Sequence, residues 1–426
     1  MKAKRSVLPV YLALFLWGNG LAIHAQEEAD AGDFYVTAGI VKDVRTKKPV
    51  EYVNVSAPGT HVGTVTNEDG EFTLKIRKEL RAKEIRLSCI GYYNAVISVT
   101  ENNREEEVRT FFMTPDSYSL SEIQVFSWKN PRDLIRAALD RVENNYVMKP
   151  NMLTGFYRET IQKRRRYITI SEAVVDLYKG PYNQPAGLDR VRVLKGRKLI
   201  SPKMADTLSV KLQGGPNMAV YMDLVKNPDL LLDREVIQYY TYKMGETTSI
   251  DDRLQYVVHF EPQMILPYPL YRGTFYIDRE TLSFTRAEFK MDLRDRQKVI
   301  SAILIEKPRG LRFTPEEVSY IVTYKYQGDK AYLNYIRNDI KFRCDWKRRL
   351  FTTGYTVSGE TVITDRDERN VTRIPAREAF SIRKSLSQEV ALYRDENFWG
   401  NYNIIEPTES LESAVNKLRK QHLKSQ

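Results

Sequence analysis

The feature that most constrains the fold is a series of long segments, between residues 153 and 365, in which apolar and polar side chains alternate. The clearest covers residues 318–346, VSYIVTYKYQGDKAYLNYIRNDIKFRCDW, and is interrupted only by Gly328-Asp329. Alternation with a period of two places the apolar side chains on one face of a strand, and a Gly-Asp pair favours a turn. The segment therefore predicts a long antiparallel hairpin with one face toward a core and one toward water.

Three further segments, at residues 167–178, 273–291 and 350–365, show the same alternation. The second of them is itself a predicted hairpin, which turns at residues 278–281. Between the strands, PNMAVYMDLVKN at residues 216–227 has the composition and apolar spacing of a helix. Long bent antiparallel strands with a helix over one face indicate an open half-barrel. This layout is similar to the lipoprotein-carrier fold of the periplasm.

The first part of the chain, from Val36 to about Met113, has shorter apolar segments that are rich in β-branched and aromatic residues. Turn signals separate them at intervals of roughly 8–12 residues, which is typical of small all-β domains. The pattern predicts a small antiparallel β-sandwich, with strands at residues 34–44, 51–59, 61–67, 71–76, 84–91 and 94–100.

Residues 65–74 of this region, VTNEDGEFTL, place three possible oxygen ligands in front of Gly70. An EF-hand loop with Gly70 at its sixth position would have Val65 at the first position and Ile76 at the twelfth, and neither can bind calcium. Asp69-Gly70 is instead a dipeptide that favours a hairpin turn, because glycine adopts positive φ without strain. The sequence predicts a structural hairpin and no metal site here.

Several short motifs give this first region a family resemblance. They include Pro49-Val50 before a Val-Asn-Val strand, Asn67-x-Asp69-Gly70-x-Phe72 and the later Ile90-Gly91-Tyr92. About 80 residues with these motifs resemble the carboxypeptidase regulatory-like domain of exported Bacteroidota proteins. The resemblance implies a seven-stranded, prealbumin-like sandwich without a catalytic role. The zinc-binding His-x-x-Glu pair of carboxypeptidases occurs only as His24-x-x-Glu27, which we attribute to chance.

The chain begins with the pattern of a secretory signal peptide. Basic residues at Lys2, Lys4 and Arg5 precede an apolar stretch at residues 7–17, and Ala25 stands at a suitable cleavage position. Cleavage after residue 22 is an alternative. No later segment has the roughly 18 consecutive apolar residues of a transmembrane helix. We therefore expect an exported protein of the periplasm or the outer-membrane surface.

These patterns divide the chain into residues 1–25 as signal peptide, 26–115 as sandwich, 116–130 as linker and 131–426 as an α+β module. Residues 117–126, SYSLSEIQVF, resemble the linker that follows this kind of sandwich in outer-membrane proteins. They fit an extended strand on the sandwich edge equally well. The complete fold is predicted to be mainly β, a sandwich followed by a long bent antiparallel sheet with covering helices.

Two helices are expected to cover that sheet. The first begins at Pro131 with Asn130 as its N-cap and reaches Val147, and its apolar residues lie on one face. The second covers residues 411–423, within a segment that resembles the tail of uncharacterised Bacteroidota proteins with the same sandwich. If either helix fills the concave side of the sheet, the module is a scaffold. If both lie elsewhere, an open groove favours a lipid-like ligand.

Charge and cysteine content narrow the possible partners. The net charge is +11, with basic clusters at residues 163–166, 347–349 and 417–424. In an exported protein these clusters fit solvated turns or an anionic surface of lipid or glycan better than nucleic acid. Cys89 and Cys344 are the two cysteines, and Cys89 lies in an apolar strand, so a free buried thiol is expected rather than a bridge.

The sequence contains no recognisable catalytic, metal or cofactor motif, so no site residue is predicted. His61, His259 and His422 lie far apart without metal-ligand spacing, and the acidic pair Asp251-Asp252 has the context of a turn. We expect a non-enzymatic exported binding or assembly protein with an unknown protein, glycan or lipid partner at the envelope. The alternatives are a periplasmic carrier of an apolar ligand and a hydrolase with a dispersed acidic site.

Overall fold

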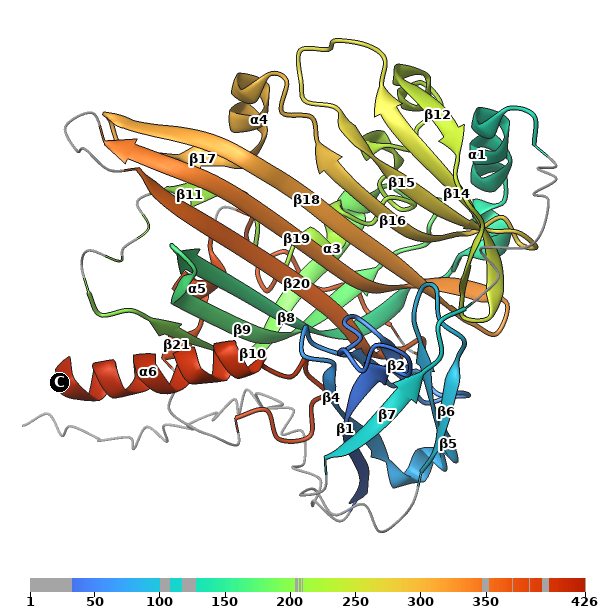
Figure 1. Ribbon diagram of the computed structural model, residues 1–426, viewed down its shortest axis with the longest axis horizontal. Coiled ribbons are helices and arrows are strands. Elements are labelled where there is room, and N and C mark those ends of the chain that lie inside the picture. Colours follow the sequence, from blue (N-terminus) through green and yellow to red (C-terminus); the bar gives the residue numbers. More distant parts are fainter. Residues whose placement is uncertain are drawn as a thin grey trace, which may run out of the picture.

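The computed structural model describes residues 33–99, 108–116, 128–203, 206, 208, 210–346, 352–369, 371–382, 384–392 and 398–425. Within these residues the protein is mainly β, with an N-terminal β-sandwich beside a large, strongly bent antiparallel sheet (Figure 1). The fold class expected from the alternating segments is therefore confirmed. The boundaries at residues 25, 115 and 130 stay predictions, because much of their surroundings lies outside the described residues.

In the described residues 33–99 and 108–116 the sandwich contains seven strands, as the family resemblance implies. One sheet has the order β4-β1-β7 and consists of Glu71–Arg77, Phe34–Asp43 and Arg109–Met113. The other has the order β3-β2-β5-β6 and consists of Gly63–Val65, Asn54–Ser56, Glu84–Ser88 and Ala95–Ser98. Alternate side chains of both sheets meet in one core, which includes Val41, Val55, Phe72, Leu74, Ile85 and Leu87.

The predicted hairpin at Asp69-Gly70 is a turn, but the prediction of its partners was wrong. β3 pairs with β2 and β4 pairs with β1, so the turn passes from one sheet to the other. The Asn67 side-chain oxygen accepts hydrogen bonds from the backbone N–H groups of Asp69 (2.9 Å) and Glu71 (2.8 Å). Gly70 has φ +77°, and a Cβ there would lie 2.5 Å from the Val41 carbonyl oxygen. Only glycine fits this corner without strain.

The large sheet has twelve strands in the described residues. The order β12-β14-β15-β16-β18-β19-β20-β8-β9-β10-β21 corresponds to Tyr240–Met244, Arg253–Pro262, Tyr271–Asp278, Phe284–Met291, Leu311–Gln327, Lys330–Trp346, Thr353–Asp367, Asn151–Lys163, Arg166–Lys179, Arg190–Ile200 and Ala391–Leu392. Thr248–Ile250 (β13) also pairs with β14, and Lys211–Leu212 (β11) pairs separately with Leu304–Glu306 (β17). The turns predicted at residues 278–281 and at Gly328-Asp329 join β15 to β16 and β18 to β19.

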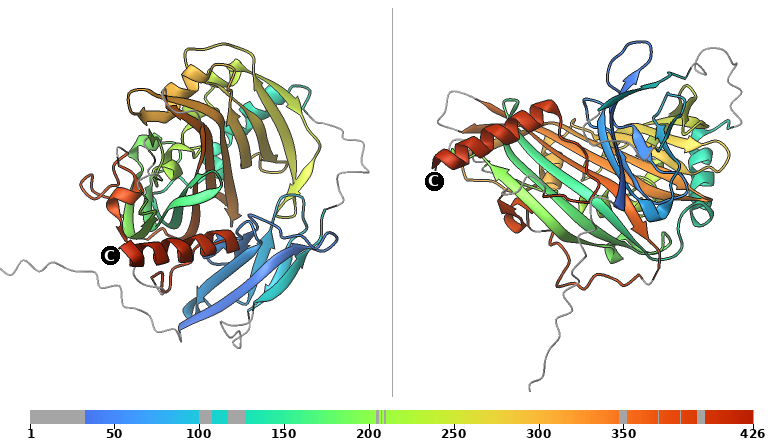
Figure 2. Two further views of the ribbon diagram at one scale, coloured as in Figure 1. Left: turned by 60° about the vertical axis from the view of Figure 1, so that its left-hand side comes forward. Right: turned by 90° about the horizontal axis from the view of Figure 1, so that it is seen from below.

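The sheet curves into a half-barrel (Figure 2). Its longest strands contain register shifts, among them one between Pro315 and Glu317 and one between Ile363 and Asp365. Such bulges bend a strand and increase its twist, which gives the sheet a concave and a convex face. On β9 the odd-numbered side chains from Ala173 to Leu177 face the concave core, whereas Ile170 and Val174 face outward.

The helices agree partly with the prediction. α1 covers Pro131–Asp140, and its N-cap is Asn130, whose side chain accepts a hydrogen bond from the Arg132 N–H group at 3.0 Å. α2 (Val142–Asn145) follows after a break. α6 covers Glu409–Ser425, while α4 (Arg296–Ile303) and α5 (Leu386–Glu389) were not predicted. Short 3-10 turns cover Lys78–Leu80, Ala186–Leu188, Pro228–Leu230 and Val236–Tyr239.

The helix expected over residues 216–227 is reduced to α3, Met218–Tyr221. Asp223 directs its carboxylate into the interior, and this carboxylate also accepts a hydrogen bond from the Lys226 N–H group at 3.3 Å. An aspartate that bonds to the nearby backbone in this way competes with helical hydrogen bonds. Pro228 begins a separate 3-10 turn, so the apolar spacing of the segment reflects burial rather than one long helix.

Candidate binding surface

The concave side of the half-barrel is filled by the chain's own side chains. α1 packs beside β12 at one edge, and residues 210–239 line the interior together with Tyr146. Rings on neighbouring strands stack there, such as Phe260 and Phe275 with centroids 4.4 Å apart. The shared core includes Leu134, Ile135, Val220, Leu224, Leu231, Leu232, Ile237, Phe284, Val322, Ile336 and Phe342.

Two lysines and two aspartates lie inside this apolar core. Lys179 Nζ is 2.6 Å from Asp223 and 3.3 Å from Asp189, and Lys226 Nζ is 3.8 Å from Asp189. Burial lowers the pKa of Lys179, but the two carboxylates more than offset this effect, so its pKa is raised overall. The four charges neutralise one another, which is what allows them to stay buried.

The same cluster joins residues 210–239 to the sheet. The hydroxyl of Tyr182 donates to Asp223 at 3.0 Å, and that of Tyr324 donates to its other oxygen at 2.7 Å. Burial lowers the pKa of Lys226, whose ammonium group donates to the backbone carbonyls of Gly180 and Pro181. A lysine with a lowered pKa can act as a nucleophile, but this side chain is fully buried and its contacts are structural.

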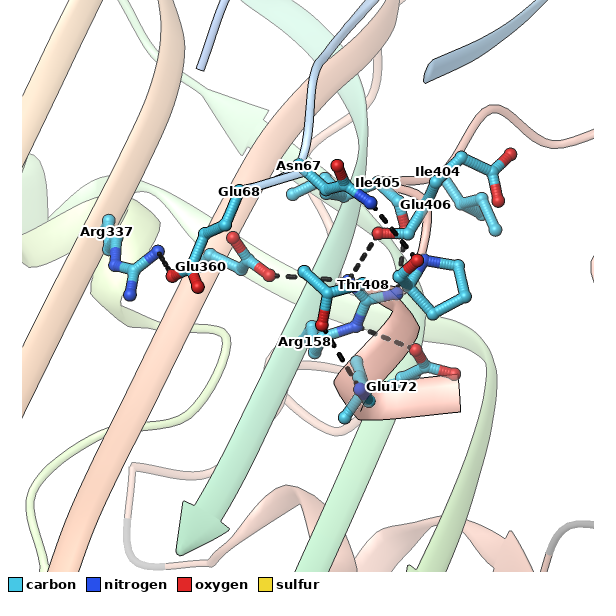
Figure 3. A network of polar contacts seen from close by, with 12 residues as sticks. Asn67, Glu68, Arg158, Glu172, Arg337, Glu360, Ile404, Ile405, Glu406 and Thr408 are labelled. Atoms are coloured by element: carbon cyan, nitrogen blue, oxygen red, sulfur yellow. Dashed lines mark hydrogen bonds and ion pairs between the residues drawn. The ribbon is translucent and has the colours of Figure 1, made fainter. Parts of the chain in front are cut away.

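The convex face carries a second buried network, centred on Arg158 of β8 (Figure 3). Its guanidinium is 2.8 Å from Glu172 and 3.5 Å from Glu360, on the two neighbouring strands. It also donates to the carbonyl oxygens of Ile405 (2.7 Å) and Glu406 (3.3 Å). Burial raises the pKa of Glu172, but Arg158 and Arg197 reverse that effect and lower it overall. Arg158 thus holds Ile405 and Glu406 to the sheet.

The turn at Asn67–Gly70 of the sandwich meets the same segment (Figure 3). The Asn67 side chain donates to the carbonyl oxygen of Pro407 at 3.1 Å, and the Asp69 carboxylate accepts from the Glu409 N–H group at 2.9 Å. Glu68 forms an ion pair with Arg337 of β19 at 2.9 Å. Of the three oxygen ligands that first suggested a calcium loop, the Asp69 carboxylate therefore binds the start of α6 and the Glu68 carboxylate binds the convex face, while the Asn67 oxygen stabilises the turn itself.

Apolar contacts complete this interface. Val65 of the sandwich packs with Phe156, Val174, Tyr335, Val362, Trp399 and Ile405. Leu411 and Leu418 of α6 pack on Ile170 and Leu199, on the outer side of β9 and β10. α6 therefore docks on the sheet as expected, but on its convex face.

A cavity of about 70 Å³ remains between the sandwich and the convex face. Lys325 of β18 lies in its wall, and burial lowers the pKa of this lysine to about 8. Asp251 and Asp252, the acidic pair noted in the sequence, form the turn between β13 and β14. Their carboxylates accept hydrogen bonds from the Asn94 side chain (3.0 Å) and N–H group (2.9 Å), so they hold the sandwich in place.

The histidines and cysteines lie apart from one another. His61 lies in the loop between β2 and β3 of the sandwich and contacts Gln327. His259 lies on the exposed side of β14 near Thr274, and His422 lies in α6. Cys89 and Cys344 are both free, and burial raises the pKa of each thiol to about 11. Within the described ranges, no three histidine, cysteine or acidic side chains gather as metal ligands.

An exposed apolar loop stands at one rim of the half-barrel. It joins β14 to β15, covers residues 263–270 and lies at the top of Figure 1, on the rim that also carries α4. Ile265 is 87% exposed, Tyr268 49% and Met264 46%, while Leu270 is buried. The sequence analysis missed this loop, although its signal is visible in PQMILPYPL, an apolar run with three prolines and no charge.

Residues 37–125 match the family model described as CarboxypepD_reg-like domain. This match confirms the resemblance stated for the sandwich, and it extends ten residues past the boundary expected at residue 115. A comparison with curated protein sequences finds no match. In the described residues, no helix is both long and apolar enough to cross a membrane.

Several solved structures have weak similarity to the chain, each at 10% identity. A candidate outer-membrane lipoprotein-sorting protein domain from Vibrio parahaemolyticus has a TM-score of 0.26 and covers 57% of this chain and 95% of its own. A DUF1329 family protein from Desulfovibrio piger has a TM-score of 0.22, covering 57% and 93%. A LolA superfamily protein from Nitrosomonas europaea has a TM-score of 0.21, covering 59% and 99%. The half-barrel is defined by the strand order given above, independently of these likenesses.

Proposed function

We propose that this chain is a non-enzymatic binding or assembly protein of the bacterial envelope, exported after removal of residues 1–25. In this proposal the half-barrel is a scaffold, and partners bind to its outer rim. The observation that carries the proposal is the filled concave side, where residues 210–239 occupy the place that an apolar ligand would need. A carrier needs a cavity of several hundred cubic ångströms for such a ligand.

The placement of the buried acidic side chains supports a non-enzymatic function. Asp189 and Asp223 pair with two buried lysines, and Glu172 lies between two arginines. A general acid needs a raised pKa and access to substrate. The pKa of Glu172 is lowered instead, after its two arginines outweigh the effect of burial. These groups act as structural ties in the proposal.

The experiment is to purify the mature protein from its native host and to analyse its chloroform extract by mass spectrometry. We expect no stoichiometric lipid, because the chain's own side chains pack on the concave side where acyl chains would lie. A second sample, incubated with the host's total lipid extract before gel filtration, controls for loss during purification. One bound lipid per chain in either sample would refute the scaffold proposal and restore the carrier alternative.

A further inference from the structure

We propose that the loop at residues 263–270, named here the rim loop, docks this protein onto a lipid bilayer that contains anionic head groups. The inference rests on the proposed location at the envelope and identifies the partner of the rim. It concerns docking by shallow insertion of a few side chains and does not involve a membrane-spanning segment.

The rim loop divides its side chains between the core and the solvent. Leu270 is buried and Leu266 packs against the main core, so these two residues anchor the loop. Met264, Ile265 and Tyr268 point away from the core and expose about half or more of their surface. A single exposed apolar side chain is ordinary, but three of them on one anchored loop form a patch that requires an explanation.

The backbone of the rim loop also suits an interface with lipid. Pro267 and Pro269 of the loop have no N–H group, so fewer backbone donors lose water when the loop enters the head-group region. The proline rings also restrict the chain, which lowers the entropy lost on docking. At the base of the loop, the Gln263 N–H group donates to the Tyr239 carbonyl oxygen at 2.9 Å and fixes its starting direction.

The base of the rim loop has a small excess of positive charge, because Arg272, Arg294 and Arg296 outnumber Asp292 and the exposed Glu261. Arg272 (3.1 Å) and Arg294 (2.5 Å) share a single carboxylate, that of Asp292, so this group keeps one net positive charge. Arg296, at the start of α4, is exposed and has no ion pair within the described residues. Apolar side chains with flanking arginines are the combination by which peripheral proteins bind anionic bilayers.

The size of the patch favours a bilayer over a protein partner. Stable protein interfaces bury roughly 1,200–2,000 Å² in total, which exceeds what three side chains on a narrow loop can supply. Binding to a bilayer requires only that Met264, Ile265 and Tyr268 enter the interfacial region while the nearby arginines contact the lipid phosphates. The sandwich and α6 lie away from this rim and leave it open (Figure 2).

The test is flotation of the full mature chain with vesicles of phosphatidylethanolamine and phosphatidylglycerol, compared with vesicles of phosphatidylcholine alone. We expect binding to the anionic vesicles that weakens as salt is raised, because exposed charges are screened. Ile265→Asp should lower the partition coefficient by about tenfold or more, and Arg296→Gln by about fivefold. Ile382→Asp is the matched control, since Ile382 is 57% exposed elsewhere on the chain, and it should bind like the wild type.

Ile265→Trp gives an independent measurement, because its fluorescence should shift to shorter wavelength with anionic vesicles. Three results would overturn the proposal. They are no binding to anionic vesicles, equal loss from the Ile382 control, or a wild-type oligomer that Ile265→Asp dissociates without any vesicle binding, which would make a second copy the occupant. None of these results changes the lipid-extraction outcome, so the scaffold proposal is tested separately.

Discussion

The two faces of the large sheet are covered in different ways. The concave face packs against segments that are close in sequence to its strands, and most of its contacts are aliphatic or aromatic. The convex face receives the sandwich and residues 398–425, and its central contacts are charged or reach backbone carbonyls. Burial of apolar side chains therefore stabilises the packing on the concave face, whereas hydrogen bonds and ion pairs determine which distant segments dock on the convex face.

Both faces nevertheless contain a buried charge cluster, and the clusters differ in composition. The inner cluster of Lys179, Lys226, Asp189 and Asp223 is neutral, and its contacts to the backbone of other residues are with Gly180 and Pro181, directly after β9. The outer cluster around Arg158 uses backbone carbonyls of residues 405–406 as well as carboxylates. Removing a charge should therefore affect global stability on the inner side, and also the docking of a segment on the outer side.

The largest effect is expected for Lys179→Met. This change leaves the buried Asp223 carboxylate without its ion pair, with two tyrosine hydroxyls and the Lys226 N–H group as hydrogen-bond donors, so the free energy of unfolding should fall by about 3–5 kcal/mol. The measurement is urea denaturation followed by tryptophan fluorescence. Lys290→Met is the control, because its ion pair with Glu317 is exposed at the lysine end and should contribute no more than about 1 kcal/mol. Equal losses of unfolding free energy in the two variants would contradict the prediction that the inner cluster contributes more to stability than an exposed ion pair.

A somewhat smaller effect is expected for Arg158→Met. Glu172 keeps Arg197 at 2.7 Å, so the loss should be about 3 kcal/mol rather than the upper end of the range. The carbonyl oxygens of Ile405 and Glu406 lose their donor, and limited proteolysis should cut near these residues faster than in the wild type. Arg77→Met, which removes an exposed pair with Glu79, is the control. Loss of stability without faster cutting would show that the network does not hold this segment.

The smallest effect concerns the pH dependence at the sandwich interface. Burial lowers the pKa of Lys325 to about 8, against about 10.4 for an unfolded lysine. The charged lysine destabilises the fold below pH 8, and this cost disappears as the pH rises from about 8 to about 10.4. A full shift between these two pKa values would correspond to roughly 3 kcal/mol. Lys325 is only partly buried, so solvent screens part of the effect, and the wild type should gain roughly a third of that value across the interval relative to Lys325→Met. A constant difference between the two proteins would mean that the lysine titrates normally.

The sequence predicted what depends on local pattern. The strands, the turn at Gly328-Asp329 and the N-cap at Asn130 follow from side-chain period and turn chemistry, which neighbouring residues determine. The Asn67–Gly70 turn was recognised, but its two sheets were not, because the identity of a strand's partner is a property of the whole chain. α3 is short because the Asp223 side chain pairs with Lys179, and Lys179 lies more than forty residues before Asp223 in the sequence.

The candidate binding surface was not predicted, for two physical reasons. Arg158 contacts two residues that lie 247 and 248 positions later in the sequence, and the periodicity of apolar residues carries no information about such long-range contacts. The rim loop does carry a local signal, an uncharged apolar run between prolines. Burial usually explains such a run, and only the structure distinguishes its anchoring leucines from the exposed Ile265.

The hydrogen bond between Asp69 and Glu409 joins residues 340 positions apart. During synthesis the sandwich emerges early, but Asn67 and Asp69 at its corner lack their partners Pro407 and Glu409 until the end of the chain has followed. Closing so large a loop is slow compared with local strand pairing, so this contact forms among the last. Docking of the start of α6 is therefore one of the last steps that complete this fold. A chain that stops short of it would present an unsealed sandwich and an open sheet face to the proteases of its compartment.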